Sequence, residues 1–261
     1  MPATTNSELT ALSLPDFWLN HCRYKEKFEQ AERAYRQSLA IEVQRGNRPG
    51  EAISLMELGT LYDCMGRLEE AVAFTRQAAD IYSALQNLSA EGACRHNLAG
   101  TLIKLQQYNK ARLELYRAIE CNNPFGHAAE PWKSWALLYD LEQATGNVPA
   151  AADARQQAAQ CYLEYRRDGG ESQQPVASLC AFIANAMRRG DTTAVAQELA
   201  YLAAITDPPP RLQTVLPKLH AIFHGDSNPA LAADPALDYD DAAELLLLLE
   251  TLGARDMESK E

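Results

Sequence analysis

Hydrophobic and polar positions along the chain alternate with the period of amphipathic helices. Leu55, Leu58 and Tyr62 recur at intervals of three, four and seven residues, and a second apolar stripe begins at Leu68, just beyond Gly66. This spacing places the apolar side chains of each segment on one helix face. A glycine between the two stripes suits the left-handed residue that ends a helix. The pattern therefore predicts two helices joined by a tight turn.

The pattern returns every 40 residues, in one column of bulky apolar residues, one of alanine and one of small residues. The columns are Phe28, Leu68, Tyr108 and Val148; Ala31, Ala71, Ala111 and Ala151; and Ser38, Ala78, Ala118 and Ala158. Glycines recur at 80-residue spacing, Gly66 with Gly146 inside a unit and Gly46 with Gly126 between units. Such recurrence predicts an array of helix pairs, in which the alanines let neighbouring helices approach closely.

The expected helix pairs lie at 15–25/28–45, 50–65/68–86, 89–105/108–121 and 130–145/149–167. Pro49 and Pro131 fit helix starts, where a missing N–H does no harm. A fifth pair follows out of phase, prolines 208–210 end the array, and two more helices are expected near 211–224 and 239–252. The expected division is a flexible N-terminus (1–11), five helix pairs within 12–206 (12–47, 48–87, 88–127, 128–170 and 175–206), C-terminal capping helices (207–253) and a flexible tail (254–261).

Composition and charge narrow the class of partner. The chain is 47% apolar and 23% charged, as expected of a folded protein, and its net charge is −11, with −7 carried by residues 175–261. Without a basic stripe, binding to nucleic acid or to an anionic membrane is disfavoured. The first residues lack the basic and apolar runs of a signal peptide, and the longest apolar run, 245–249, is too short to cross a bilayer.

The six cysteines predict a reducing environment. No two of them form a Cys-x-x-Cys pair, and they occupy positions suited to small core residues. A disulfide framework is possible for an even number, but a chain of this length rarely needs one. We therefore expect reduced, buried thiols in a cytoplasmic protein.

The sequence offers little catalytic or metal-binding chemistry. Neither a Gly-x-Ser-x-Gly elbow nor a His-Glu-x-x-His motif occurs. His220 and His224 are four residues apart and close to Asp226, a spacing that can bind a metal, but ordinary histidines near a helix end are the favoured interpretation. We expect no catalytic residue, no cofactor and no metal site, and hence not an enzyme.

Three of the units resemble tetratricopeptide repeats. The matching residues are Leu58, Gly59, Tyr62, Gly66, Leu68, Ala71 and Ala78; Leu98, Ala99, Tyr108, Ala111 and Ala118; and Trp135, Leu138, Gly146, Ala151 and Ala158. Forty residues exceed the usual 34, which implies longer helices, similar to the extended repeats of bacterial peptide-sensing regulators. Glu142 departs from the pattern, since it stands where the second unit has Tyr62. The resemblance implies an all-α fold, a right-handed superhelical solenoid of antiparallel helix pairs with a C-terminal helical cap.

In such a solenoid the first helix of each unit lines a concave wall, which implies a recognition surface. One column of this wall would be Asn20, Thr60, Gly100 and Asp140. The candidate partner-binding residues are Asn20, Arg23, Tyr24, Glu57, Thr60, Asp63, His96, Asn97, Lys104, Lys133, Asp140 and Gln143. Their side chains can hydrogen-bond an extended peptide, although solvated helix surfaces carry the same residue types.

Three functions remain open at this point. The favoured one is a non-catalytic scaffold or adaptor that holds a protein or peptide in its concave groove. The alternative is a peptide- or ligand-responsive regulator that controls a partner protein by changing the solenoid's conformation. The third is self-assembly, as a homodimer, through the leucine-rich final helix at 239–252.

Overall fold

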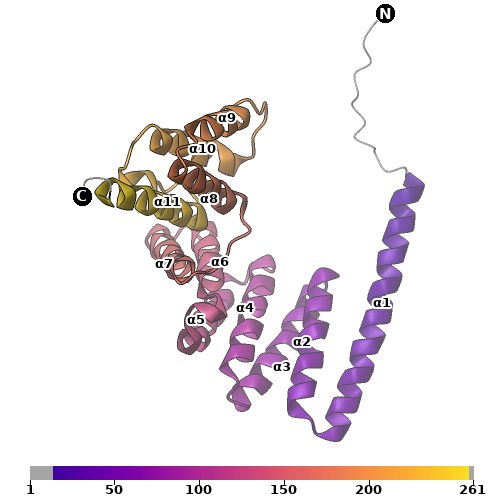
Figure 1. The fold of residues 1–261 in the computed structure, drawn as a ribbon. Helices are drawn as coiled ribbons and strands as arrows, with labels where there is room; N and C mark the ends of the chain where they lie inside the picture. The colour runs from indigo at the N-terminus through magenta and orange to yellow at the C-terminus, as the bar shows by residue number, and fades with distance from the viewer. Residues whose placement is uncertain (1–13, 259–261) are drawn as a thin grey trace, which may run out of the picture. The chain divides into compact units, whose positions relative to one another are not determined.

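The computed structural model describes residues 14–258, with the side chains of residues 27–253, and consists of helices joined by turns and loops (Figure 1). No strand occurs in this described range. The helices are α1 (Leu14–Arg45), α2 (Arg48–Cys64), α3 (Leu68–Ala84), α4 (Leu88–Lys104), α5 (Tyr108–Asn122), η1 (Asn123–Ala129), α6 (Pro131–Ala144), α7 (Val148–Arg167), α8 (Pro175–Arg188), α9 (Thr192–Ala203), α10 (Pro210–Phe223), η2 (Pro229–Leu231) and α11 (Tyr239–Glu258). The all-α, tetratricopeptide-like architecture is therefore confirmed.

The chain forms two compact units, Met1–Glu114 and Leu115–Glu261. In unit 1, α2 packs against α1 and α3, and α3 packs against α4, so that consecutive helices run antiparallel (Figure 1). Asn47 caps α2 by accepting a hydrogen bond from the Gly50 N–H, and Asn87 caps α4 in the same way. The core contains Ala52, Leu55, Leu58, Tyr62, Ala71, Ala78, Ala79, Ile81, Tyr82 and Cys94.

After α1, the alanine and small-residue columns mark places of close helix contact, as the sequence predicted, whereas Ala31 of α1 is only half-buried and Ser38 is exposed. Ala71, Ala78 and Ala111 of unit 1 and Ala158 of unit 2 are completely buried, and Ala151 is almost so. A larger side chain at these positions would hold the paired helices apart, because protein interiors are close-packed.

A left-handed turn residue recurs every 20 positions. Gly66 and Gly146 have φ of 73° and 74° in the turns inside units, and Gly46 and Gly126 have φ of 66° and 55° in the turns between them. Glycine adopts this conformation without steric cost. In two further turns of this 20-residue spacing, the left-handed residue is a glutamine, Gln86 or Gln106.

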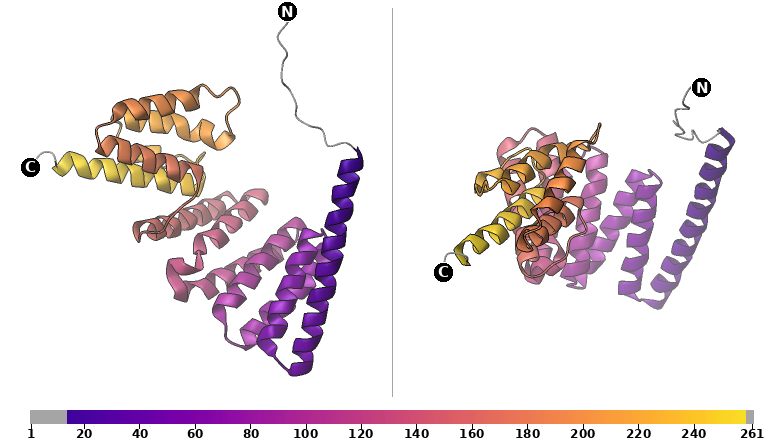
Figure 2. Two further views of the ribbon diagram at one scale, coloured as in Figure 1. Left: turned by 45° about the vertical axis from the view of Figure 1, so that its right-hand side comes forward. Right: turned by 45° about the horizontal axis from the view of Figure 1, so that its top comes forward.

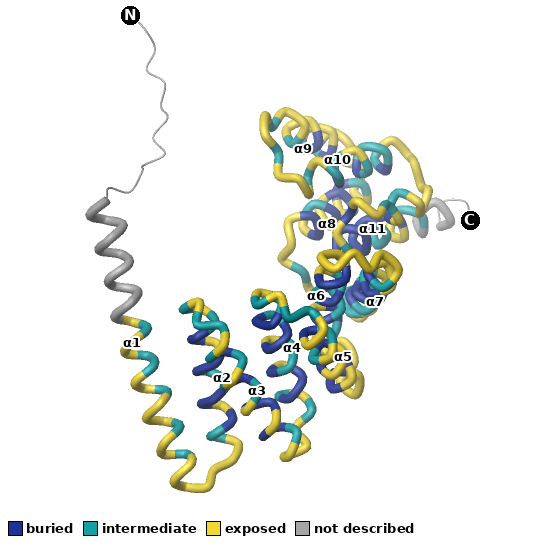
Figure 3. The backbone as a smooth tube through the Cα atoms, turned by 180° about the vertical axis from the view of Figure 1, so that it is seen from behind, coloured by how far each residue is buried: buried dark blue, intermediate teal, exposed yellow. Residues whose placement is uncertain are grey.

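The first expected pair, 15–25/28–45 within 12–47, is wrong, because α1 is one continuous helix from Leu14 to Arg45. In the 20-residue cycle, position 26 should hold the left-handed residue, but the chain has Glu26 there, between Lys25 and Lys27. All three are good helix formers, so nothing interrupts the helix. The described part of α1 is largely exposed (Figure 3). Residues 1–11, expected to be flexible, lie outside the described residues.

Unit 2 contains the α6–α7 pair and the four helices after it. α11 packs on α7 and on α8, and the views of Figure 2 show α8 and α11 side by side. α11 continues to Glu258, so the expected flexible tail from residue 254 is wrong for 254–258, because Gly253 stays helical; residues 259–261 lie outside the described range. The main core of unit 2 includes Val176, Cys180, Ile183, Ala186, Val195, Leu199, Val215, Leu219, Ile222, Leu245, Leu248 and Leu249.

Glu142, which departs from the repeat pattern, is buried and makes polar contacts. Its carboxylate accepts a hydrogen bond of 3.0 Å from the Asn147 side chain, in the turn that leads into α7. In unit 1 the corresponding Tyr62 packs its ring in the core. The α6–α7 pair therefore has a carboxylate–amide contact at its turn, where the α2–α3 pair has an aromatic ring.

The cysteines match the expectation of burial in part. Cys94, Cys121 and Cys180 are buried and Cys161 is half-buried, but Cys64 is exposed because it ends α2 on the solvent side, so its predicted burial is wrong. The side chain of Cys22 lies outside the described residues. Burial raises the pKa of the Cys94 and Cys180 thiols to about 12, so both stay protonated at neutral pH.

Candidate functional site

Unit 1 contains a polar cavity of about 240 Å³ between α2 and α4. The two helices open successive repeats, and α3, which joins them, contributes only Thr75 to the lining. Two glycines line it, Gly59 on α2 and Gly100 on α4. The remaining lining residues are Thr60, Asp63, His96, Asn97, Thr101 and Lys104.

A small hydrogen-bond network fixes one side of the cavity. Lys104 Nζ lies 2.5 Å from Asp63 Oδ2, and Thr101 Oγ1 lies 3.0 Å from Asp63 Oδ1. Thr101 Oγ1 is also 3.2 Å from the Asn97 carbonyl oxygen, so its single proton has two acceptors. Asp63 belongs to one repeat, and both of its partners belong to the next. The network therefore holds the first helices of two repeats in register.

Asn97 lies on α4 at the edge of this network with its side chain exposed. Among the described residues its side-chain amide makes no hydrogen bond, so it can both donate to a ligand and accept from one. Thr60 Oγ1 donates back to the Met56 carbonyl at 3.1 Å, which leaves the hydroxyl oxygen as an acceptor. The cavity thus presents donors and acceptors of both kinds.

The structure brings five of the candidate residues together in this cavity, namely Thr60, Asp63, His96, Asn97 and Lys104. Glu57, also on α2, does not line it. The Glu57 carboxylate hydrogen-bonds the Tyr35 hydroxyl on α1, and its charge is the main reason that the pKa of Tyr35 is raised. The side chains of Asn20, Arg23 and Tyr24 lie outside the described residues.

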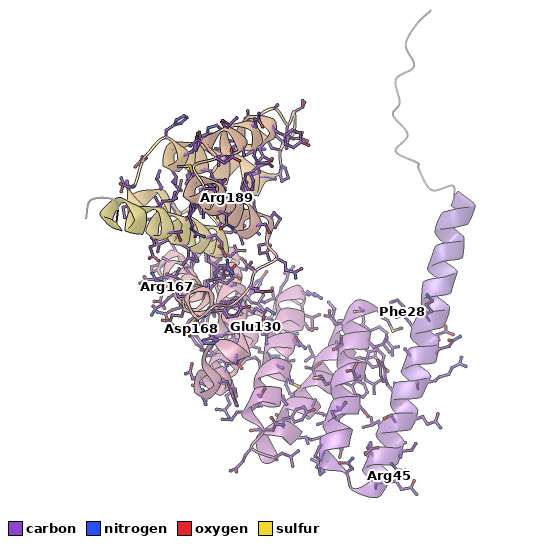
Figure 4. The ribbon with its side chains drawn as sticks, viewed as in Figure 1. Phe28, Arg45, Glu130, Arg167, Asp168 and Arg189 are labelled. Atoms are coloured by element: carbon purple, nitrogen blue, oxygen red, sulfur yellow. The ribbon has the colours of Figure 1, made fainter. Side chains whose placement is uncertain are left out.

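The three candidates of unit 2 do not share a cavity, since Lys133 and Gln143 have local partners and Asp140 has a like-charged neighbour from a distant segment. Lys133 contacts Glu130, which lies between η1 and α6 (Figure 4). The Gln143 side chain donates to the Tyr139 hydroxyl at 3.2 Å. Partial desolvation, and then the charge of Asp238, raise the pKa of Asp140, so Asp140 faces the start of α11.

Sequence reasoning missed three lining residues, Gly59, Thr75 and Thr101. In the sequence Gly59 stands out only as part of the repeat pattern, and Thr75 is on a second helix, whereas the resemblance implies recognition by first helices. Thr101 is buried beside its acceptor Asp63. One signal was available for Thr101, since it follows Asn97 by four residues on the same helix face.

One carboxylate cluster in unit 2 has metal-like geometry. Oxygens of Asp238, Asp240 and Asp241 lie within 4.8 Å of one another, and this is the one group of three or more acidic, histidine or cysteine ligands in the described part of the chain. The Arg211 guanidinium contacts all three carboxylates, at 2.8, 2.9 and 2.6 Å. Arginine already supplies the positive charge there, so the cluster serves to join α10 to α11.

His220 and His224, whose spacing could suit a metal, form no cluster of three potential ligands with an acidic side chain among the described residues. The rings of His220 and His224 stack at a centroid distance of 6.3 Å, and neither belongs to the cluster of carboxylates. Across the described range no helix combines the length and apolar character needed to span a bilayer.

Comparison with known proteins places the fold in a family. Residues 20–84 match the family model for the tetratricopeptide repeat. Among solved structures, BtubC (BKLC) from P. vanneervenii is similar, with 22% sequence identity, a TM-score of 0.53, and coverage of 78% of this chain and 77% of that chain. No curated protein sequence matches the chain.

Residues 20–84 therefore match the tetratricopeptide repeat itself, and the similarity to BtubC supports a fold of this kind for the larger part of the chain. Repeats of this family generally mediate protein–protein interactions, by presenting helix faces to a partner.

Proposed function

We propose that this protein is a non-catalytic scaffold or adaptor that binds an extended segment of a partner protein in the cavity between α2 and α4. The observation that carries the proposal is the convergence of Thr60, Asp63, His96, Asn97 and Lys104, from two helices, on one cavity. These residues lie on α2 and α4, each of which is the first helix of its repeat. A partner segment laid across α2 and α4 would meet all five.

The chemistry of the cavity suits a peptide backbone. An extended peptide presents an N–H donor and a C=O acceptor at each residue, and the Asn97 amide can pair with both. Lys104 and Asp63 lie beside it as a charged pair, with Lys104 about half exposed. An acidic side chain of the partner would compete with Asp63 for Lys104. Because rigid helices hold these groups before binding, little ordering entropy is lost on the protein's side.

The class of partner follows from charge. With a net charge of −11 and no basic stripe, the protein would repel nucleic acid and anionic membranes, so we infer a protein or peptide partner. A cytoplasmic location fits the cysteines, since Cys64, Cys94, Cys121, Cys161 and Cys180 form no disulfide.

Homodimerisation through the leucine-rich helix receives less support. Leu245, Leu248 and Leu249 of α11 are buried in the core of unit 2, so they are not available to a second copy. Sizing with light scattering at micromolar concentration tests this directly. A regulator that changes its repeat arrangement on binding would instead show a ligand-dependent change in small-angle scattering.

Selection of a random peptide library on the full-length protein tests the binding proposal. Peptides are selected on the wild type and counter-selected on an Asn97→Ala/Lys104→Ala variant. A matched Gln77→Ala/Lys110→Ala variant likewise removes one side-chain amide and one lysine, at exposed positions of unit 1 that do not line the cavity. We expect selected peptides to bind the wild type and the matched variant, and to lose about tenfold or more in affinity for the cavity variant. Equal binding to all three folded proteins contradicts the proposal.

A further inference from the structure

A second cavity, of about 680 Å³, lies in unit 2 against α8, α9 and the start of α10. Seven of its eleven lining residues are apolar, including Val176, Leu179 and Phe182 of α8, Leu202 of α9, and Pro209 and Leu212 beside them. Its volume falls within the range of roughly 300–1,000 Å³ found for ligand sites. Hereafter we call it the α8–α9 groove.

The groove is a preformed surface on a packed core. α9 packs against both α8 and α10. Beneath them, Ile183, Val195 and Leu199 are almost completely buried in the core of unit 2. Phe182 nevertheless remains 37% exposed in the groove wall. Apolar surface held open by a rigid core, with an accessible aromatic ring, is typical of a site that receives another molecule.

One uncompensated charge is set in this apolar wall. Glu198 of α9 is half-buried, and it makes no hydrogen bond or ion pair with any described residue. The other charged lining residue, Arg211, is already paired with Asp238, Asp240 and Asp241. The groove therefore presents a negative charge beside apolar side chains. A partly desolvated carboxylate gains most from a cation that approaches it directly.

The backbone of the occupant is constrained as well. The α8–α9 groove is built from helices, whose main-chain groups are bonded internally, and mostly from apolar side chains. A segment buried there has few partners for its own N–H and C=O groups, so it must satisfy them itself. An α-helix does so, and helix-in-groove binding is the mode in which an apolar helix face fills such a surface.

We propose that the α8–α9 groove binds an amphipathic helix of a partner protein, with its apolar face against Leu179, Phe182 and Leu202 and a lysine or arginine paired with Glu198. The charge of −7 over residues 175–261 also favours the approach of a basic segment to this part of the chain. The site lies in unit 2 and shares no residue with the cavity of unit 1, so either proposal can fail without the other.

Fluorescence anisotropy with the full-length protein and defined probes tests this inference. The first probe is an alanine-based helical peptide of about 15 residues, with leucines spaced i, i+3/i+4 and i+7 and one lysine beside them. The second probe replaces that lysine by glutamate. We expect the wild type to bind the lysine probe about tenfold more tightly than the glutamate probe. Equal affinity for the two probes, or no binding of the lysine probe, overturns the proposal.

Variants locate the interaction. Glu198→Gln should bring the two probes within about twofold of each other, and Phe182→Ala should weaken both by about fivefold or more. Glu69→Gln, at an exposed position of unit 1, is the matched control and should leave both affinities unchanged. Circular dichroism melting establishes that each variant is folded. Preference for lysine that survives in Glu198→Gln, or unchanged affinity in Phe182→Ala, also overturns the proposal.

Discussion

Gly59 and Thr75 meet where α2 crosses α3, so closely that a Cβ atom on Gly59 would lie 2.1 Å from Thr75 Oγ1. The same atom would lie 3.2 Å from the Thr75 backbone nitrogen, so rotation of the threonine relieves only part of the contact. Thr75 is buried, and both residues line the cavity of unit 1. Glycine at position 59 thus sets the distance between the two helices of a repeat.

Replacement of Gly59 by alanine should therefore destabilise unit 1. Overpacking costs about 1–3 kcal/mol, and it outweighs the gain of up to about 1 kcal/mol from alanine's helix propensity. Adding Thr75→Ala should recover much of the loss, because it removes the closest atom. Urea denaturation of the two single variants and the double variant measures this coupling. Gly253→Ala, where a Cβ meets open space, should be neutral or stabilising; a Gly59→Ala protein as stable as the wild type would show that the helices can separate freely.

Gln106 should be replaceable by glycine with a gain in stability. It holds a φ of 58° in the turn between α4 and α5, where Gly66 and Gly146 occupy the equivalent turns. A side chain in this region costs about 1–2 kcal/mol, and the greater freedom of glycine in the unfolded chain offsets part of that. Thermal and urea denaturation should show a gain of about 0.5–1 kcal/mol. Gln77→Gly, inside α3, should instead lose about 1 kcal/mol; a loss of the same size at Gln106 would contradict the argument.

The repeat period and the glycines made much of the fold predictable from sequence. Alanine columns and turn glycines report local requirements, close approach and positive φ, that few other residues satisfy. The prediction failed in α1, because the 40-residue period predicted a turn near Glu26 although no residue suited to a turn is present there. Here local helix propensity prevailed over the repeat.

For the candidate site, the sequence could predict only which residues lie on the same helix face. Thr60, Asp63, His96, Asn97 and Lys104 share the face of first helices, and they converge on one cavity. Periodicity cannot show which surface residues already have partners in space. Glu57 is bonded to Tyr35, and Asp140 faces Asp238, which is almost one hundred residues away in the chain. Such neighbours, whether they attract or repel, depend on packing between distant segments.

Acid should weaken the contact between α1 and α2 through Glu32. The Tyr62 hydroxyl donates to the Glu32 carboxylate at 2.7 Å, and Arg36 and Arg67 add positive charge, so the pKa of Glu32 is lowered although desolvation opposes the shift. A depressed pKa contributes stability above the ordinary value of 4.5 and loses it as pH falls through the folded-state pKa. Glu32→Gln should thus cost about 1 kcal/mol at pH 7 and little at pH 3.

Urea denaturation of Glu32→Gln and wild type at both pH values measures the difference. Glu29→Gln is the matched control on the same helix, since its ion pair with Arg33 spans 3.8 Å and is well exposed. Its effect should be small at either pH. A penalty for Glu32→Gln that persists unchanged at pH 3 would assign the loss to packing and not to the charge.

Glu244 joins α11 to α7 through a buried ionic contact. Its carboxylate accepts 2.7 Å hydrogen bonds from the Tyr162 hydroxyl and from Arg166 Nε, and its side chain is only 3% exposed. Neighbouring apolar contacts also hold α11, since Ala243 packs with Trp132 and Tyr162. Two kinds of interaction therefore fix the last helix to the fourth repeat pair.

Removal of this carboxylate should loosen α11 specifically. Glu244→Ala leaves Arg166 partly buried without its partner, and losing one member of a buried pair costs about 3–5 kcal/mol. Glu244→Gln keeps an acceptor for Tyr162 and should cost less, whereas Glu250→Ala removes an exposed pair with Arg167 and should cost under about 1 kcal/mol. Hydrogen exchange locates the effect: amides of α11 and of the facing part of α7 should lose protection in Glu244→Ala, while those of α2 and α3 should not. A uniform loss of protection over both units would mean that α11 supports the whole chain, and unchanged protection would mean that the apolar contacts of Ala243 suffice to hold it.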